Sequence, residues 1–422
     1  MTTREENERL CRIGPGTAMG AMFRRFWMPI ALSSKLREAG GPPRHERLLG
    51  EDFVVFRDTG GRIGVLDELC MHRGASLVLG RVEDCGIRCL YHGWKFDVDG
   101  NVVDMMNNSD RKLWARMKAP AYPVREAGGI VWTYLGPKEK EPPFPHFRYF
   151  DLPASHCVNM RVDANANWVQ ATEGGLDSSH VGILHTNAAR PAWQGGSDDH
   201  VGELDDTAPT LEIEDTDFGY HYGAVRKGAA GRPDNVRIVP FFMPSGRIIP
   251  DIRPTGNATI IFEVPIDDEN TATYSVRYGP KPIERMSRVS ETGFDDPEFY
   301  DEESGKFLMG RRDYHMQKRH QMGLAWSGFR GIALEDAVIA TSQGPIYDRT
   351  KEHLIASDLA VVRFRRRVLD AAARVERGED PLGLHVDSSR ITAIDAPMPP
   401  GGRHWRSLVP DHRVAGKEPV EA

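Results

Sequence analysis

The chain has 422 residues, which is long enough for a large hydrophobic core and about two domains. Its 54 lysines and arginines stand against 61 aspartates and glutamates, so the formal net charge is −7. This balance argues against a nucleic-acid partner, because phosphates select a clearly basic face.

Neither a membrane anchor nor a disulfide framework is expected. No apolar run approaches the roughly 20 residues of a membrane helix, and the first residues, MTTREENERL, are too polar for a secretory signal. The five cysteines are an odd number, and those that cluster are better explained as metal ligands than as disulfides. We therefore expect a soluble cytoplasmic protein.

Short strands dominate the sequence from about residue 41 to residue 135. Segments such as RLLGEDFVVFRD, GRIGVLDE and GGIVWTYLG alternate with the turn sequences DTGGR, DVDGN and EAGG. The Pro- and Lys-rich stretch GPKEKEPPFPHF then indicates a boundary. This region is predicted to be a small all-β unit.

The pattern changes after about residue 150. NANWVQATEGGLDSSHVGILH predicts a helix, and four later segments predict strands of one antiparallel sheet: TLEIEDTDFGYHYGAVRK, NVRIVPFFM, NATIIFEVPI and ATYSVRYG. The sequence from ALEDAV onward predicts two helices that separate near QGP. The second unit is therefore an α+β domain in which helices flank an antiparallel sheet.

Two cysteines and two histidines form the first candidate metal site, as Cys70-x-His72 followed by Cys89-x-x-His92. Such a set suits either a structural zinc or a Rieske [2Fe–2S] cluster. Each loop supplies one cysteine and one histidine, so each can reach both irons of a cluster. Glycines follow both histidine loops, at Gly74 and Gly93, where the backbone has to pack closely. We favour the cluster.

The segments CMHRGASL and CLYHGWKFDVDG resemble the Rieske domain of ring-hydroxylating Rieske non-haem iron oxygenases. The resemblance implies a Rieske domain at residues 41–140 and a catalytic domain formed by residues 1–40 and 141–422. It also implies a second metal site, a mononuclear Fe(II) held by two histidines and one carboxylate.

A second cluster of candidate ligands lies in NWVQATEGGLDSSHVGILH. Asp177 and His180 are three residues apart, which places them on one face of a helix. His185 lies about 140° further round an ideal helix, so both imidazoles reach one ion only if the helix ends or bulges, for which Gly182 is a candidate.

The pattern N-W-x-Q-x-x-E-x-x-x-D-x-x-H-x-x-x-x-H resembles the catalytic helix of these oxygenases. The resemblance implies His180 and His185 as iron ligands and Asp336 as the distant carboxylate, with Glu335 as its competitor. It further implies that Asp177 connects His180 to His92 of a neighbouring subunit, so that the enzyme is at least a trimer, or a stacked hexamer. Otherwise, Asp177 simply accepts a hydrogen bond from its own His180.

The segment GPIYDRTKEHL followed by SDLAVVRFRRRVL resembles the phthalate dioxygenase branch, whose members typically oxidise aromatic carboxylates. A carboxylate substrate requires a fixed cation, and Arg226 and Arg237 on the predicted sheet are the candidates. The arginines of RFRRR, which are Arg363 and residues 365–367, are instead assigned to a solvated helix face or a subunit contact.

The resulting hypothesis is the oxygenase component of a multicomponent Rieske enzyme that dihydroxylates a phthalate- or benzoate-like acid with O₂. The chain shows no dinucleotide-binding G-x-G-x-x-G after a strand, so electrons should come from a separate NADH-dependent reductase with flavin and iron–sulfur groups. The alternatives are a monooxygenase or an O- or N-demethylase of a related acid, and more remotely an electron-transfer or zinc-stabilised binding protein.

Overall fold

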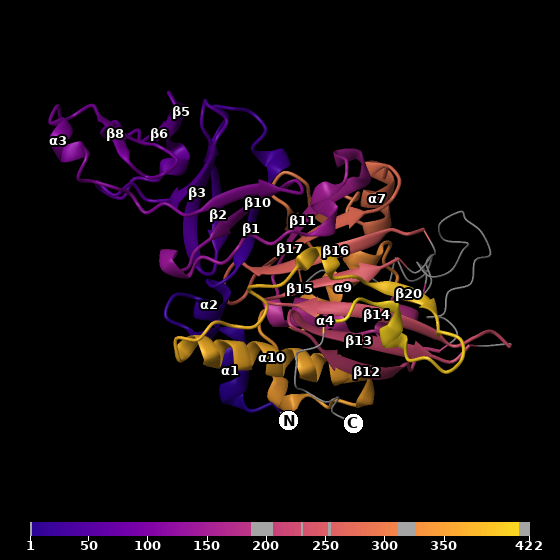
Figure 1. Cartoon of the computed structure of the whole chain (residues 1–422). Helices are drawn as coiled ribbons and strands as arrows, with labels where there is room; N and C mark the ends of the chain where they lie inside the picture. Colours follow the sequence, from indigo (N-terminus) through magenta and orange to yellow (C-terminus); the bar gives the residue numbers. More distant parts are fainter. Residues whose placement is uncertain (1, 187–205, 229–230, 252–254, 311–325, 413–422) are drawn as a thin grey trace.

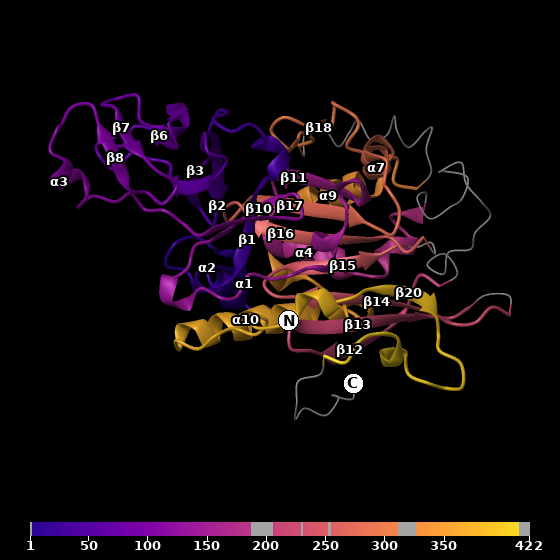
Figure 2. The ribbon, with the colours of Figure 1, turned by 45° about the horizontal axis from the view of Figure 1, so that its top comes forward.

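The computed structural model describes residues 2–186, 206–228, 231–251, 255–310 and 326–412. It consists of a small β-rich part, coloured indigo to purple, and a larger part built around an extended sheet (Figures 1 and 2). None of the helices in these ranges combines the length and apolar character needed to cross a bilayer.

The β-rich part contains three small antiparallel sheets with the strand orders β1-β10-β9, β2-β3-β4 and β5-β6-β7-β8. Its strands are β1 (Trp27–Leu32), β2 (Arg44–Leu48), β3 (Glu51–Arg57), β4 (Ile63–Asp67), β5 (Arg81–Glu83), β6 (Gly86–Arg88), β7 (Trp94–Phe96), β8 (Val102–Met105), β9 (Val124–Ala127) and β10 (Ile130–Tyr134). The prediction of a small all-β unit is confirmed.

A ten-stranded sheet forms the larger part, in the order β12-β13-β14-β15-β16-β17-β11-β19-β18, with β20 paired to β14. Its strands are β11 (Cys157–Ala164), β12 (Thr210–Asp215), β13 (Gly219–Arg226), β14 (Asn235–Phe242), β15 (Gly246–Pro250), β16 (Ala258–Pro265), β17 (Thr271–Tyr278), β18 (Tyr300–Asp301), β19 (Lys306–Phe307) and β20 (Ile394–Pro397). All four predicted strand segments lie in this sheet, and the neighbouring pairs β12 to β17 are antiparallel.

Among the described residues, the helices that flank this sheet, as predicted, are α1 (Arg4–Cys11), α2 (Ala18–Phe23), α4 (Trp168–Leu176), α7 (Arg285–Thr292), α9 (Ile332–Ser342) and α10 (Leu359–Glu376). Helix α3 (Arg111–Trp114) lies instead in the β-rich part, beside β8 (Figure 1). Helix α4 packs against β16, β17 and α9, whereas α10 packs against α2 and β12. The two predicted C-terminal helices are α9 and α10.

The β-rich part contributes side chains to two separate hydrophobic cores. One small core contains Cys70 and Cys89 and lies within the β-rich part. Strand β10 instead contributes to the large core, where Trp132 packs edge-on against Phe262 of β16 at 5.0 Å between ring centroids. Strand β10 also pairs with β1, a strand from the predicted catalytic segment 1–40. The division at residues 41–140 stays a prediction.

The motif residues around α4 explain why this helix is fixed in place. Asn167 caps its N-terminus by accepting from the backbone N–H of Val169 at 3.1 Å. The Trp168 indole donates to the carbonyl of Leu10 at 3.1 Å. Gln170 donates to the carbonyl of Gly344 and accepts from the N–H of Tyr347, both at 2.8 Å.

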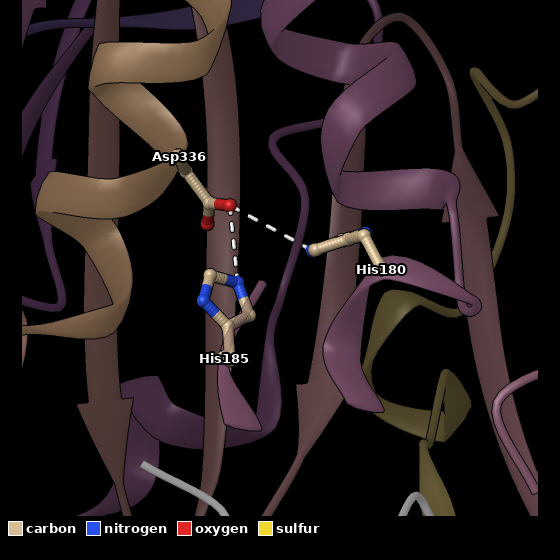
Figure 3. Close-up of side chains that lie close together, drawn as sticks. All are labelled: His180, His185 and Asp336. Atoms are coloured by element: carbon tan, nitrogen blue, oxygen red, sulfur yellow. Dashed lines mark ion pairs between the residues drawn. The ribbon is translucent and has the colours of Figure 1, made fainter. Parts of the chain in front are cut away.

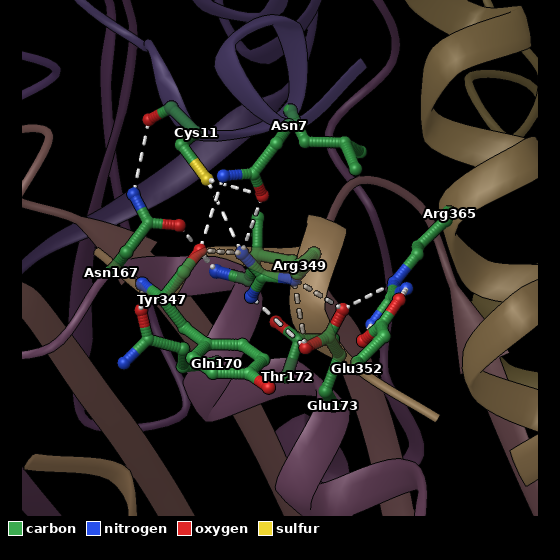
Figure 4. Close-up of polar contacts among 12 residues, drawn as sticks. Asn7, Cys11, Asn167, Gln170, Thr172, Glu173, Tyr347, Arg349, Glu352 and Arg365 are labelled. Carbon is green, nitrogen blue, oxygen red and sulfur yellow. Dashed lines mark hydrogen bonds and ion pairs between the residues drawn. The ribbon is translucent and has the colours of Figure 1, made fainter. Parts of the chain in front are cut away.

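A buried ion-pair network fastens the same helix to the C-terminal helices (Figure 4). The Glu173 carboxylate accepts from Arg349 Nη2 at 3.0 Å and from Arg365 Nε at 2.6 Å. Arg365 also donates to Glu352 at 2.9 Å, and Arg349 donates to Asn7 of α1 at 3.1 Å. Helices α1, α4 and α10 are thereby joined through charged groups that are largely removed from water.

The structure corrects the interpretation of RFRRR as a solvated face. Arg365 is buried in the Glu173 network, and Arg363 and Arg367 both pair with Asp215, Arg367 at 2.5 Å. Only Arg366 of this run is exposed. Alternating arginines of α10 therefore pair with carboxylates of the same chain.

The Glu173 network predicts a large loss of stability on neutralisation. Burial raises the pKa of Glu173, but Arg349 and Arg365 lower it more, so the pKa lies below the ordinary value. The carboxylate thus stabilises the fold above its unfolded-state pKa, and this contribution is lost as pH falls through the lower folded-state value. We expect Glu173→Gln to lower the free energy of unfolding by about 3–5 kcal/mol at pH 7, measured by urea denaturation.

The exposed neighbour Arg366 provides the control on the same helix bundle. Arg366→Gln should change the free energy of unfolding by less than about 0.5 kcal/mol. Equal urea midpoints for the two variants would contradict the importance of the network.

Candidate functional site

The two loops that carry the Cys and His residues have matching backbone geometry. In the first loop, Gly74 N–H donates to the carbonyl of Cys70 at 2.9 Å; in the second, Gly93 N–H donates to Cys89 at 3.1 Å. Both glycines have a positive φ, of 68° and 71°, a conformation that glycine adopts without a steric penalty. The predicted close packing is present at Gly93, where a Cβ would lie 2.5 Å from the Met106 side chain, but among the described residues no close approach occurs at Gly74, where only the backbone conformation favours glycine.

The four candidate ligands divide by depth. The thiols of Cys70 and Cys89 are buried at 3% and 2% exposure, whereas His72 and His92 are partly exposed. The two imidazoles lie 4.5 Å apart between ring centroids, and His72 stacks on the Trp94 indole at the same distance. A cluster held here has its thiolate side inside the small core and its histidine side at the surface.

The donor spacing separates a cluster from a single zinc ion. Ligand atoms around tetrahedral zinc, with bonds of about 2.0–2.3 Å, lie within about 4 Å of one another. Among the residues that the structure describes, no three of these four donors lie within 4.8 Å of each other. Burial and the neighbouring Cys89 raise the pKa of Cys70 to about 11, so paired thiolates here require cationic compensation. The arrangement fits two irons.

The second site lies where α4 ends, and here the sequence-based prediction of the helix is wrong in extent. Helix α4 ends at Leu176, with Asp177 as its C-cap, and a short 3₁₀ turn follows at His180–Gly182. Asp177 and His180 therefore do not share a helix face. The expected break occurs six residues before Gly182, and it frees the chain to turn both imidazoles the same way.

His180, His185 and Asp336 converge from two elements (Figure 3). Asp336 projects from α9, and its Oδ1 lies 3.1 Å from His185 Nε2 and 3.7 Å from His180 Nε2. All three donor atoms lie within 4.8 Å of one another, so they could hold one metal ion. Two imidazoles and one carboxylate on one side of a metal form the 2-His-1-carboxylate arrangement of non-haem Fe(II) oxygenases.

The structure distinguishes between the two adjacent carboxylates of α9. Asp336 faces the Nε2 atoms of both histidines, whereas Glu335 accepts from Nδ1 of His185 at 2.6 Å and is only 2% exposed. Glu335 therefore contacts the far side of the His185 ring. The geometry agrees with Asp336 as the candidate ligand.

The electrostatics of this site suit a cation. Burial lowers the pKa of His185, but Asp336 and Glu335 raise it to about 10. Burial raises the pKa of Asp336, and the two histidines lower it below its usual value. The carboxylates therefore place negative charge around the three candidate ligand atoms. A divalent cation can replace the proton that His185 and Asp336 would otherwise share.

Asp177 contacts His180 of its own chain, as in the alternative in which it only accepts a hydrogen bond from this histidine. Its Oδ2 lies 3.3 Å from His180 Nδ1, and its Oδ1 accepts from the backbone N–H and hydroxyl of Ser179, both at 2.8 Å. Burial raises the pKa of Asp177 and His180 lowers it, with a net lowering. A contact to a neighbouring subunit stays a prediction.

The two arginines predicted to bind substrate are both engaged by the protein. Arg226 donates to the carbonyl of Ser178 at 2.6 Å and to that of Asp206 at 3.0 Å. Arg237 pairs with Asp395 at 2.6 Å and donates to the carbonyl of Pro250. Arg226 thus supports the turn between Asp177 and His180, and a substrate contact for either arginine stays a prediction.

Arg247 is a functional candidate that the sequence-based reasoning missed. It lies on β15, is 6% exposed, and donates from Nη2 to Glu263 at 2.7 Å. Its Nε and Nη1 have no hydrogen-bond partner among the described residues, although both are buried. The guanidinium lies against Gly175 of α4, where a Cβ would be 2.0 Å from Nε, and its charge contributes to the lowered pKa of Asp336.

No sequence pattern marks Arg247, because it stands as a single charge in the otherwise apolar segment FFMPSGRIIP. Its close approach to Gly175 joins residues that are far apart in the chain. Unpaired buried N–H groups are costly unless a ligand or water satisfies them, so Arg247 is suited to hold an anion near the metal site.

Comparisons with known proteins agree with both sites. A family model described as "Rieske [2Fe-2S] domain" matches residues 26–122, and one described as "LigXa C-terminal domain like" matches residues 133–419. The chain is 38% identical to the phthalate 4,5-dioxygenase oxygenase subunit of Pseudomonas putida, covering 94% of this chain and 92% of the relative.

A second relative and a solved structure show the same kind of similarity. The 3-chlorobenzoate-3,4-dioxygenase oxygenase subunit of Comamonas testosteroni is 34% identical over 91% of this chain and 92% of its own. The fold matches a solved complex of oxygenase and ferredoxin in carbazole 1,9a-dioxygenase, with a TM-score of 0.57 at 21% identity, covering 92% and 97% of the two chains.

These findings identify the enzyme class and its cofactors. The resident groups are a Rieske [2Fe–2S] cluster and a mononuclear iron, for which the donor sets described above are suited. The chain belongs to the Rieske non-haem iron ring-hydroxylating oxygenases, as an oxygenase subunit of the phthalate dioxygenase-like branch.

Proposed function

We propose that this oxygenase subunit oxidises an aromatic carboxylate, dihydroxylating its ring with O₂ and electrons from a separate NADH-dependent reductase. In this proposal, residues 41–140 carry the cluster on Cys70, His72, Cys89 and His92. The remainder, residues 1–40 and 141–422, carries the iron on His180, His185 and Asp336. The protein is proposed to act in the cytoplasm.

The observation that carries the substrate class is the buried guanidinium of Arg247. Its Nε lies against Gly175 of α4, its buried Nη1 has no hydrogen-bond partner among the described residues, and its charge helps to lower the pKa of Asp336. A carboxylate on the substrate would accept a charge-assisted hydrogen bond from Nη1 and orient the ring toward the metal site. Relatives named for phthalate and 3-chlorobenzoate substrates support the same class.

When bound, the cluster supplies single electrons and the mononuclear iron supplies open positions for O₂ and substrate chemistry. The chain's own residues then have distinct tasks. Asp177 contacts Nδ1 of His180, and Arg226 donates to the carbonyl of Ser178, which lies in the chain between Asp177 and His180. Arg247, which is held by Glu263, positions the substrate.

The surface around the cluster loops supports docking of other proteins. Exposed apolar side chains surround the partly exposed His72 and His92: Leu69, Met71, Leu90, Tyr91 and Met106. Such a patch suits a protein interface. We assign it to an electron donor and to a second copy of the chain in a trimer or stacked hexamer, in which Asp177 connects His180 to the neighbour's His92.

The ligand assignment predicts independent loss of the two metal groups. Cys89→Ser should abolish the visible absorption of the Rieske cluster, because a serine hydroxyl does not replace the thiolate as an iron ligand. Asp336→Asn should retain that absorption but lose about one iron per chain, measured by iron and acid-labile sulfide analysis.

The exposed His146 serves as a control for both variants, since His146→Ala should leave iron, sulfide and absorption unchanged. Retention of full iron content in Asp336→Asn would contradict the ligand assignment.

The substrate proposal is tested by single turnover. Chemically reduced protein is mixed with O₂ and a panel of benzoates, phthalates and methoxylated acids, and products are identified by mass spectrometry. We expect gain of two oxygens and two hydrogens. Gain of one oxygen or loss of a methyl group would establish the monooxygenase or demethylase alternative.

Arg247→Met should raise the KM for the acid by about tenfold to a hundredfold, because a charge-assisted hydrogen bond to the carboxylate is lost. The corresponding neutral amide should be affected much less. Arg403→Met, at an exposed position, is the matched control. An equal effect on acid and amide would contradict the role of Arg247 as carboxylate anchor.

The role of Asp177 is tested by Asp177→Asn. Product formed in one turnover should fall about tenfold or more, while iron content and cluster absorption remain. Asp370→Asn, an exposed carboxylate on α10, should behave as the unmodified protein. Unchanged product yield in Asp177→Asn would exclude an electron-transfer role.

A further inference from the structure

We infer that Glu335 is the positioning residue of His185: it fixes the ring so that Nε2 faces the mononuclear iron, and Ser327 holds Glu335 in place. This inference rests on the proposed iron site. Glu335 contacts His185 Nδ1 and Ser327, so in this inference its effect on the iron site is transmitted through His185.

The contact geometry defines the orientation of the imidazole. His185 Nδ1 lies 2.6 Å from Glu335 Oε2, and Nε2 on the other side lies 3.1 Å from Asp336 Oδ1. A carboxylate can only accept, so Nδ1 carries the hydrogen. The lone pair available for a metal is then on Nε2, which is the atom that faces Asp336 and His180.

Glu335 is itself held by a defined donor. The hydroxyl of Ser327 donates to Glu335 Oε1, and the backbone N–H of Phe329 donates to the Ser327 oxygen at 3.1 Å. Glu335 and Ser327 are 2% and 6% exposed. Both carboxylate oxygens are therefore occupied, one by the ring and one by the hydroxyl, which leaves the side chain little freedom to rotate.

Each histidine therefore has a carboxylate at its Nδ1 atom, but the two carboxylates differ in exposure. Asp177 contacts His180 Nδ1 at 3.3 Å and has a partly exposed side chain, so it can also contact a neighbouring subunit. Glu335 is buried inside the chain and cannot do so. Its contribution is confined to the orientation and basicity of His185.

The adjacent positions 335 and 336 explain how one helix supplies both groups. Neighbouring side chains on a helix diverge by about 100°, so α9 directs Asp336 to the Nε2 side of His185 and Glu335 to its Nδ1 side. The His185 ring lies between two consecutive carboxylates and is enclosed at 5% exposure.

The test compares iron affinity rather than activity. In Glu335→Gln protein, we expect the affinity of the mononuclear site for Fe(II) to fall about tenfold to a hundredfold, measured by competition with a chelator. The Rieske absorption should be unchanged. The electron paramagnetic resonance spectrum of the ferrous site treated with nitric oxide should shift, because the ring orientation changes. Ser327→Ala should shift both readouts in the same direction by a smaller amount.

Glu46→Gln is the matched control, because Glu46 is also a buried carboxylate at 6% exposure but pairs with Arg161 away from the iron site. It should lower stability while leaving iron affinity and the nitric oxide spectrum unchanged. If Glu335→Gln does not fold, the inference is decided by Ser327→Ala against Glu46→Gln.

The possible results separate this inference from the proposed function. Failure of the unmodified protein to bind mononuclear iron would overturn the proposed function. Normal iron binding with identical affinity and spectrum in Glu335→Gln or Ser327→Ala would overturn only the positioning role. Complete loss of iron in Glu335→Gln, equal to that in Asp336→Asn, would overturn it by making Glu335 a ligand.

Discussion

Glu173 brings a carboxylate into the interior, where Arg349 and Arg365 from the C-terminal part of the chain meet it. Its position on α4 matters because this helix carries Gly175 and ends directly before Asp177. Together with the cap at Asn167, the ion pairs fix the helix at several points along its length. The iron site depends on that fixation, since both histidines follow within a few residues of the helix end.

The charged groups around the iron site differ in which atoms of the two histidines they contact. Asp336 faces the donor atoms, whereas Glu335 and Asp177 contact the outer nitrogens of the two histidines. Arg247 provides a positive group on the opposite element, β15, and it is partly neutralised by Glu263. A dication and an anionic substrate can therefore be accommodated together without leaving a large uncompensated charge.

The Rieske loops are partly exposed, unlike the buried surroundings of His185, because the cluster must exchange electrons with partner proteins. The thiols lie within the small core, while the histidines reach the surface among exposed apolar side chains. Two nearly equivalent backbone loops, each closed by a glycine N–H, hold this arrangement. Burial protects the thiolate side, and exposure of the imidazole side shortens the path for electrons.

The sequence by itself determined the features that depend on local spacing. The Cys-x-His and Cys-x-x-His loops with their glycines, the strands and the two C-terminal helices follow from short-range chemistry and periodicity. The resemblance of the motif around α4 to a family implied His180 and His185, and the same resemblance, rather than the motif itself, favoured the distant Asp336 over Glu335.

Tertiary structure decided what depends on distant contacts. Helix α4 ends at Leu176 with Asp177 as its C-cap, and not at Gly182. The arginines at 363, 365 and 367 looked solvated, but Asp215 and Glu173 come from other elements to pair with them. Arg247 and Glu335 acquire their roles only because β15 meets Gly175 and α9 meets His185, and such contacts between remote residues leave no periodic pattern in a single sequence.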